Sequence, residues 1–323
     1  MAQTDYTYAV ARIRFKETAL LSDSDYDILL SASDAQTCIR NLKDKGWGGN
    51  AENDSAEDLI SFEENNLWSF MTEIVQDKSI FNFILVKNDF HNLKVAIKCV
   101  TRDVKPDDML IQNAVTSPEL VFDAVSKREY QRLPEYLSET ARYAMSTLLS
   151  TSDGQLCDMI VDRMCLSHIF HLKEIYDSDI IKLFCELTVA SSDIKIAVRC
   201  AKTKKSLDFI KKALVPCDSL NIEKLAQSAS SGYDSIIEYL STTEYKSAVN
   251  ALNDSMSAFE KWCDDYMTEI LKPQKWEPFS IGPVIGYLVA KQNEIKAVRM
   301  ILSAKINHID DLLIRERLRK SYV

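Results

Sequence analysis

The residue spacing that comes nearest to a reactive site is formed by Cys165, His168 and His171, each three positions after the last. On a helix Cys165 and His168 share a face, and His171 joins them only after some rotation. Thiolate and imidazole groups are zinc ligands, but a structural zinc site usually needs four ligands. Asp158 and Asp162 lie one or two turns earlier and would give a mixed ligand set. No further Cys or His cluster completes the site, so we predict no bound metal and interpret these residues as part of a packed helix.

Motifs for catalysis or phosphate binding are absent from the sequence. The chain has four histidines, and it contains no G-x-x-x-x-G-K-[ST], G-x-G-x-x-G, G-x-S-x-G or H-E-x-x-H spacing. Its one glycine cluster, at 45–50, is followed by an acidic stretch that would repel a phosphate group (Glu52, Asp54, Glu57 and Asp58). We interpret the cluster as a loop between helices, and we predict no catalytic residue and no cofactor.

A short phrase recurs three times, as NDFHNLKVAIKC at 88–99, VASSDIKIAVRC at 189–200 and KQNEIKAVRM at 291–300. It places Lys94, Lys195 and Lys296 at equivalent positions, 101 residues apart in each case. A repeat this long indicates three copies of a domain-sized unit, with an approximate three-fold axis available to them. If the units surround such an axis, the three lysines could contact acidic groups of a central partner. The alternative is that each lysine lies over the core of its own unit and faces water.

Helical periodicity dominates the segments that would position these residues. The clearest example predicts one long C-terminal helix with an apolar face made of Leu288, Ile295, Val298, Leu302, Ile306, Ile309 and Leu313. Upstream of each phrase we expect a short helix that closes on Leu42, Leu137 or Leu240. A longer helix follows it, over 64–75, 153–164 or 259–270. No stretch shows sustained alternation of the kind that strands have, so we predict an all-α fold.

Breaks in the pattern divide the chain into three similar helical domains. They cover 1–115, 116–217 and 218–323, and the last includes the C-terminal helix. RDVKPDD at 102–108 and TSPEL at 116–120 separate the first two domains, and LVPCDSLN at 214–221 separates the last two. These linkers are short and not rich in Gly or Ser, so we expect the domains to pack together.

The composition indicates a globular, helical protein of a reducing compartment. Of the 323 residues 46% are apolar and 27% charged, whereas glycine and proline number only seven each, which leaves few residues for tight turns. A net charge of −9 argues against nucleic acid as the main partner. Eight scattered cysteines without an export signal favour free thiols. No apolar run approaches the ~20 residues that span a bilayer, so we expect a soluble, cytoplasmic protein.

Four aromatic residues lie near loops or helix ends: Trp47, Tyr266, Trp276 and Phe279. Exposed aromatics often dominate protein interfaces. Large aromatic side chains are more often buried, so we expect all four to fill the core.

Several segments of the chain resemble the C-subunit family of V-type and A-type ATPases, whose eukaryotic member is called the d subunit. The C-terminal part is the most specific, with GYLVAKQNEIKAVR at 286–299 and RERLRKSYV at 315–323. YTYAVARIRFKETALLS at 6–22 is similar to the first helix of that family, and HNLKVAIKC at 91–99 to its first-domain phrase. The resemblance extends from residue 6 to the last residue, and the middle domain matches least.

The resemblance implies a fold and a role. The fold is three similar helical domains in a funnel-like arrangement about a pseudo-three-fold axis. The role is that of a non-catalytic central-rotor subunit, which couples the central stalk to the membrane proteolipid ring during ion transport linked to ATP hydrolysis or synthesis. One copy is expected in each complex, as a peripheral component on the cytoplasmic side of the membrane, with the stalk subunits and the ring as partners.

Two other hypotheses remain open at this point. The chain could be an α-helical scaffold with an unrelated partner. It could also be an enzyme that uses scattered carboxylates or the group Cys165, His168 and His171. The absence of catalytic motifs argues against the enzyme.

Overall fold

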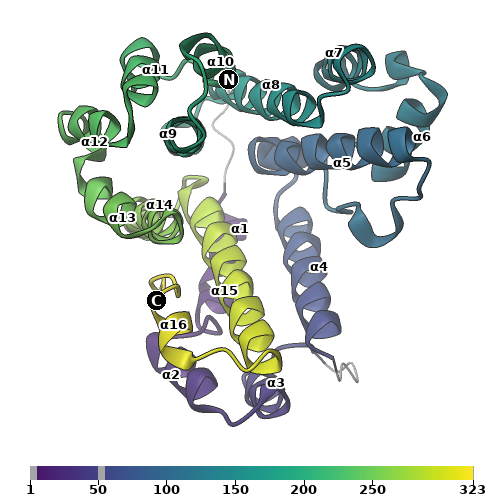
Figure 1. The fold of residues 1–323 in the computed structure, drawn as a ribbon. Helices are drawn as coiled ribbons and strands as arrows, with labels where there is room; N and C mark the ends of the chain where they lie inside the picture. Colours follow the sequence, from purple (N-terminus) through teal and green to yellow (C-terminus); the bar gives the residue numbers. More distant parts are fainter. Residues whose placement is uncertain (1–5, 50–54, 323) are drawn as a thin grey trace. The chain divides into compact units, whose positions relative to one another are not determined.

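The described part of the chain, residues 6–49 and 55–322 of the computed structural model, consists of helices and turns without a β-strand (Figure 1). The prediction of an all-α fold is confirmed. Within the glycine cluster, residues 45–49 form a turn after a helix, as expected. Asn50, Glu52 and Asp54 lie outside the described residues. No described helix is both long and apolar enough to cross a membrane.

Two compact units make up the chain: one contains Met1–Asp77 with Asn250–Val323, and the other contains Lys78–Val249. The predicted boundaries after residues 115 and 217 both lie inside the second unit. The division into three domains and their funnel-like arrangement remain predictions.

The first unit is built around one long helix, α15 (Gly282–Ile306). Helix α15 packs against helices from both ends of the chain, and Figure 1 shows it running beside α4. Every residue from Ile281 to Lys291 is buried, so the start of α15 is enclosed on all sides. The other helices of this unit are α1 (Thr7–Glu17), α2 (Asp23–Ser31), α3 (Ala35–Asp44), α4 (Ala56–Ile74), α13 (Val249–Asp254), α14 (Met256–Leu271), η5 (Lys272–Trp276) and α16 (Asp311–Arg315).

The second unit is built around α8 (Gly154–Ile175), which packs against four other helices of the unit, α5, α7, α9 and α10. Its other helices are η1 (Lys78–Phe81), α5 (Asn82–Arg102), η2 (Asp107–Met109), α6 (Pro118–Lys127), η3 (Tyr130–Arg132), α7 (Glu135–Thr151), α9 (Asp179–Lys202), α10 (Leu207–Ala213), α11 (Ile222–Ser231), α12 (Tyr233–Ser241) and η4 (Glu244–Ala248).

The recurring phrase lies on three long helices, α5, α9 and α15, and each packs against helices of another repeat. Helix α5 of the first repeat contacts α6, α7 and α8 of the second, and α9 contacts α11 and α12 of the third. Helix α15 of the third repeat contacts α1, α3 and α4 of the first. Because each of these helices packs against another repeat, the compact units do not coincide with the sequence repeats.

The three phrase-bearing helices also end in the same way. Each is followed by a residue with a left-handed backbone: Asp103 at φ 54°, Lys204 at φ 52° and His308 at φ 53°. The next N–H then reaches back five residues, from Val104 to Cys99, from Lys205 to Cys200 and from Ile309 to Ala304. Glycine is the usual residue in this conformation, because a side chain costs roughly 1–2 kcal/mol there. This glycine-poor chain therefore closes its three phrase-bearing helices with strained residues.

Two predictions about helix boundaries were wrong. The C-terminal stripe does not form one helix to Leu313, because α15 ends at Ile306 and a new helix starts at Asp311. Ile306, Ile309 and Leu313 are exposed, whereas the earlier members of the stripe are buried.

The helix predicted to close on Leu240 is confirmed as α12, which ends at Ser241, but no helix closes on Leu137, which lies in the first turn of α7. Helix α6 ends at Lys127 and α7 starts after Pro134, where a proline fits the beginning of a helix. A bend at Gly232 with φ 134° separates α11 from α12.

Candidate functional site

Each phrase-bearing helix has a buried polar side chain at the position two residues before the repeated lysine. The three residues are Asn92, Asp193 and Glu294, and their exposed fractions are 0%, 0% and 3%. Each accepts a hydrogen bond from the backbone of a connecting segment, and we call them the clasp residues. Our sequence analysis selected the lysines and overlooked these positions. Their signal was a polar residue at a fixed offset within an apolar phrase.

The clasp of the first repeat is a neutral amide. Asn92 Oδ1 accepts from the N–H of Ile111 at 2.8 Å, and Asn92 Nδ2 donates to the carbonyl oxygen of Ile111 at 2.9 Å. One turn earlier, the buried carboxylate of Asp89 accepts from the N–H groups of Val115 and Thr116 at 2.8 and 3.1 Å. Asn92 and Asp89 together hold the segment after α5 against that helix, and Asn92 does so without carrying a charge.

The clasp of the second repeat is a carboxyl group with a hydrogen-bond donor at only one of its two oxygens. Asp193 Oδ1 accepts from the N–H of Val215 at 3.1 Å, and Oδ2 is buried with no hydrogen-bond donor among the described residues. Burial raises the pKa of Asp193 to about 8, and the nearby charge of Glu186 adds to the rise, against the opposing effects of the Val215 hydrogen bond and of Arg163. Asp193 is therefore predominantly protonated at neutral pH.

The clasp of the third repeat is an ion-paired carboxylate. Glu294 Oε2 accepts from the N–H of Leu21 at 2.5 Å, and Oε1 accepts from Lys291 Nζ at 2.6 Å. Lys291 Nζ also lies 3.0 Å from Glu63 Oε2 and 4.2 Å from the ring centre of Trp47. Burial opposes the charge on Lys291, but Glu294 and Glu63 outweigh it and raise the pKa of Lys291. Two acids and one base thus share this buried site.

The repeated lysines are placed differently from the clasp residues. Lys94 Nζ lies 2.6 Å from Asp162 Oδ1 on α8, and Lys296 Nζ lies 2.5 Å from Asp264 Oδ2 on α14. Lys195 is half-buried, and its side chain makes no hydrogen bond or ion pair with another described residue. Lys94 and Lys195 belong to the second compact unit and Lys296 to the first, so the structure gives no common site for the three. Their role at an interface remains a prediction.

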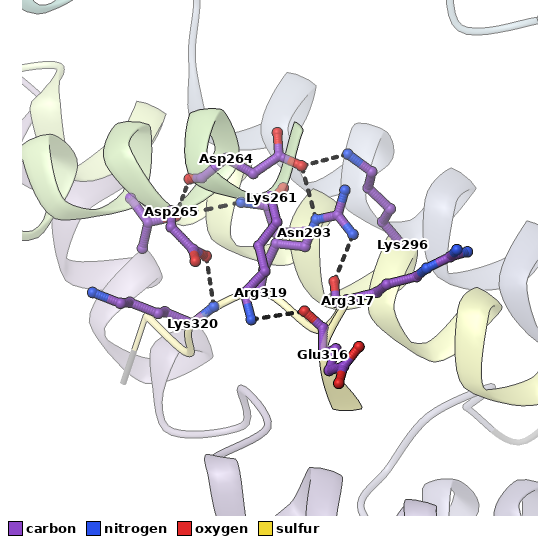
Figure 2. A network of polar contacts seen from close by, with 10 residues as sticks. Lys261, Asp264, Asp265, Asn293, Lys296, Glu316, Arg317, Arg319 and Lys320 are labelled. Atoms are coloured by element: carbon purple, nitrogen blue, oxygen red, sulfur yellow. Dashed lines mark hydrogen bonds and ion pairs between the residues drawn. The ribbon is translucent and has the colours of Figure 1, made fainter. Parts of the chain in front are cut away.

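Lys296 is part of a polar network that fastens the C-terminal tail (Figure 2). Asp264 accepts from both Lys296 and Arg319, and the distance from Arg319 Nε to Asp264 Oδ2 is 2.9 Å. On the same helix, Asp265 accepts from the N–H of Lys320 at 2.8 Å. Because Asp264 is shared, Lys296 contributes to the anchoring of the tail.

The group Cys165, His168 and His171 does not converge on one point. The ring of His168 stacks on Tyr136, with 4.1 Å between ring centres, whereas His171 is exposed. Burial lowers the pKa of His168 and raises the pKa of Cys165 to about 12, so the thiol is protonated at neutral pH. Among the described residues no group of three or more His, Cys, Asp or Glu side chains could hold a metal ion.

The prediction that four aromatics fill the core was wrong for two of them. Trp47 is buried, but Trp276 and Phe279 are 80% and 67% exposed. Both lie in the connection between α14 and α15, where no amphipathic helix indicates which side chains face the core. Tyr266 is half-buried and stacks on Trp262, with 4.8 Å between ring centres.

Comparison with known proteins gives a consistent result along the chain. A family model described as ATP synthase (C/AC39) subunit matches residues 9–317. The chain is 24% identical over 271 residues to the C subunit of the V-type sodium ATPase of Enterococcus hirae, covering 81% of each chain. It is 23% identical over 347 residues to the C subunit of the A-type ATP synthase of Methanosarcina mazei, covering 98% of this chain and 93% of the relative. The corresponding protein of Desulfurococcus is 23% identical over 333 residues, covering 97% of this chain and 90% of the relative.

Proposed function

The chain belongs to the ATP synthase (C/AC39) subunit family, and on this basis we propose that it is the non-catalytic rotor subunit that couples the central stalk to the membrane proteolipid ring in a V/A-type ATPase. The observation that carries the proposal is the family match over residues 9–317. The relatives named as C subunits also align along most of their own length.

The packing of the chain suits a part that transmits torque. A coupling must resist twisting, and close-packed helices transmit strain because they contain little free volume. The clasp residues add buried hydrogen bonds between the phrase-bearing helices and their connecting segments. A buried, satisfied polar contact also fixes register, which further limits sliding between elements.

The proposal includes a location and a number of copies. One copy of the chain would lie on the cytoplasmic side of the membrane as a peripheral component, in contact with the stalk and the ring. Of the three repeated lysines, Lys195 is the best candidate for an intersubunit contact, because Lys94 and Lys296 already have acidic partners within the chain.

Affinity purification from native membranes tests the assembly. The chain would be tagged, extracted in mild detergent, and its partners identified by peptide mass spectrometry with quantification. We expect stalk and ring components to co-purify with one copy of the chain in each assembly. Recovery of a free homotrimer, or of a complex without these components, would contradict the proposal.

Removal and replacement of the chain test the coupling role. Membrane vesicles that lack the chain should lose ATP-driven ion uptake, and addition of the purified chain should restore it. The control is ATP hydrolysis by the detached head, which should not need this chain. Normal ion uptake in vesicles without the chain would reject a coupling function.

A further inference from the structure

Positive charge is concentrated in one part of this acidic chain. The segment 199–212 contains six cationic residues and one acid, Asp208, although the whole chain has a net charge of −9. The cations are Arg199, Lys202, Lys204, Lys205, Lys211 and Lys212. They follow one another across the end of α9 and along α10.

The end of α5 adds two more cations to the same region. Lys205 Nζ donates to Gln155 Oε1 at 3.1 Å, so the end of α9 lies beside the first turn of α8. Lys98 Nζ lies 2.8 Å from Asp158 Oδ2, one turn further along α8, so the last turns of α5 also lie there. Arg102 and Lys105 lie four and seven residues after Lys98 and are exposed. Three segments of the second unit therefore meet at the start of α8.

Most of these cations are available to a partner. We define the basic surface as Arg102, Lys105, Arg199, Lys202, Lys204 and Lys212, which are all exposed. None of the six makes a hydrogen bond or ion pair through its side chain within residues 6–49 and 55–322. Cations in the last turn of a helix interact with its partial negative charge, and this accounts for the four that lie there: Arg102, Arg199, Lys202 and Lys212. It does not account for Lys105 and Lys204, which follow the helices.

We propose that the basic surface at the ends of α5 and α9 binds an anionic lipid surface. Clusters of four to eight cations attract anionic headgroups, and each cation adds to the affinity. Exposed apolar side chains lie in the same region: Val104 after α5 is 50% exposed, and Leu149 in the last turn of α7 is 59% exposed. Apolar residues beside cations favour the boundary between headgroups and acyl chains.

A lipid surface fits these residues better than an acidic peptide does. The cations come from two separate segments, 102–105 and 199–212, they are exposed, and they line neither of the two described pockets. Four of the six are lysines, which act as mobile point charges and tolerate a partner without fixed geometry. The inference does not rest on the rotor role, because the isolated chain should show this binding.

Vesicle sedimentation of the purified full chain tests the proposal. The vesicles contain phosphatidylcholine alone or with an equal share of phosphatidylglycerol, at low salt. We expect binding to the anionic vesicles only, and release at about 1 M salt, where the Debye length is about 3 Å. The variant K202Q/K204Q/K212Q should bind on the order of 100-fold more weakly.

The matched control is K78Q/K224Q/K246Q, which removes the same charge from three exposed lysines elsewhere in the second unit. This control should keep nearly all the binding. Equal loss in both variants would show that net charge alone is responsible and would overturn the proposal. The proposal would also fail if the chain bound soluble polyglutamate but not the anionic vesicles, since the partner would then be an acidic protein segment.

Discussion

The clasps of the first and second repeats occupy equivalent positions and hold a backbone segment in the same manner, yet they differ in one functional group. Asn92 exchanges two hydrogen bonds with Ile111, whereas Asp193 makes one with Val215 and leaves Oδ2 without a donor. An amide carries its own donor, so it satisfies both backbone groups without charge. A buried carboxyl has to take up a proton or find a cation, and the difference makes one clasp insensitive to pH and the other sensitive.

The third repeat shows the other solution to the same problem. Glu294 keeps its position near an N–H group because Lys291 supplies a compensating charge. The three repeats thus use an amide, a protonated acid and an ion pair for one structural task. The backbone contact is common to them, while the response to pH and to mutation should be specific to each.

The largest expected effect comes from Asp193→Asn, which converts the second clasp into the first. The pKa of Asp193 is about 3.9 in the unfolded chain and is raised to about 8 in the folded chain, so the folded state favours the protonated carboxyl. The stability of the parent protein is therefore highest below about pH 3.9 and falls as the pH rises through about 8. Asparagine does not titrate, so the variant should gain stability over the parent with rising pH. The gain should reach about 5 kcal/mol at pH 9, at about 1.4 kcal/mol for each pH unit. Urea unfolding of both proteins at pH 5, 7 and 9 measures the difference, and a gap independent of pH would refute it.

Lys291→Met should lower the stability of the chain by nearly as much as Asp193→Asn raises it. The variant leaves Glu63 and Glu294 buried without their shared cation, and loss of one partner of a buried pair costs about 4 kcal/mol. The expected outcome is a lower unfolding midpoint in urea at pH 7 that partly recovers toward pH 5, because burial raises the pKa of Glu294 and favours its protonation. Lys296→Met, which removes an exposed pair, serves as the control. Similar losses in the two variants would show that the burial of Lys291 with Glu63 and Glu294 is unimportant.

Asn92→Asp is the reverse substitution, because it gives the first clasp the carboxyl group of the second. It places a carboxylate oxygen next to the carbonyl of Ile111 and removes a donor, so we expect a loss of about 2 kcal/mol at pH 7. The loss should shrink on acidification, so that the first clasp acquires the pH response of the second. Hydrogen exchange at the amide of Ile111, followed between pH 5 and 8, reports this locally. Unchanged protection of that amide would mean that the clasp does not hold the segment.

The smallest effect concerns a feature that the repeats share, the left-handed residue after each phrase-bearing helix. His308→Gly should stabilise the chain by about 1 kcal/mol, because glycine adopts φ 53° without the clash of a side chain. His308→Ala is the matched control and should bring no such gain. Thermal unfolding of the two variants compares them directly, and an equal rise in both would exclude backbone strain as the cause.

Local sequence was a good guide to the existence of helices. The phrase and the longer segment before it predicted α5, α8, α9, α14 and α15, because their apolar periodicity extends over many turns. It was a poor guide to helix ends. Apolar residues at helical spacing continue through the break at Asn307–Asp310, and only the left-handed backbone at His308 ends α15.

The site was less predictable, because it depends on contacts that are distant in the sequence. The partner of Glu294 is the backbone of Leu21, and no feature near either residue connects them. The repeat did contain a usable clue, since Asn92, Asp193 and Glu294 are polar residues at one position of an apolar phrase. The exposure of Trp276 and Phe279 had no such clue, because a connecting segment has no periodicity that separates buried from exposed residues.

The packing of helices from one repeat against those of another affects the order in which parts of the protein can fold during translation. Helix α4 ends at Ile74, and its partner α15 starts at Gly282, so the ribosome adds roughly 200 residues between them. Ser321 Oγ also donates to the carbonyl oxygen of Leu21 at 3.0 Å, a contact between residues 300 positions apart. At 5–20 residues per second, the apolar face of α4 waits about 10–40 s for its cover. The segment from Lys78 to Val249 has all of its own partners sooner, so we expect it to fold first while the N-terminal helices depend on protection from aggregation.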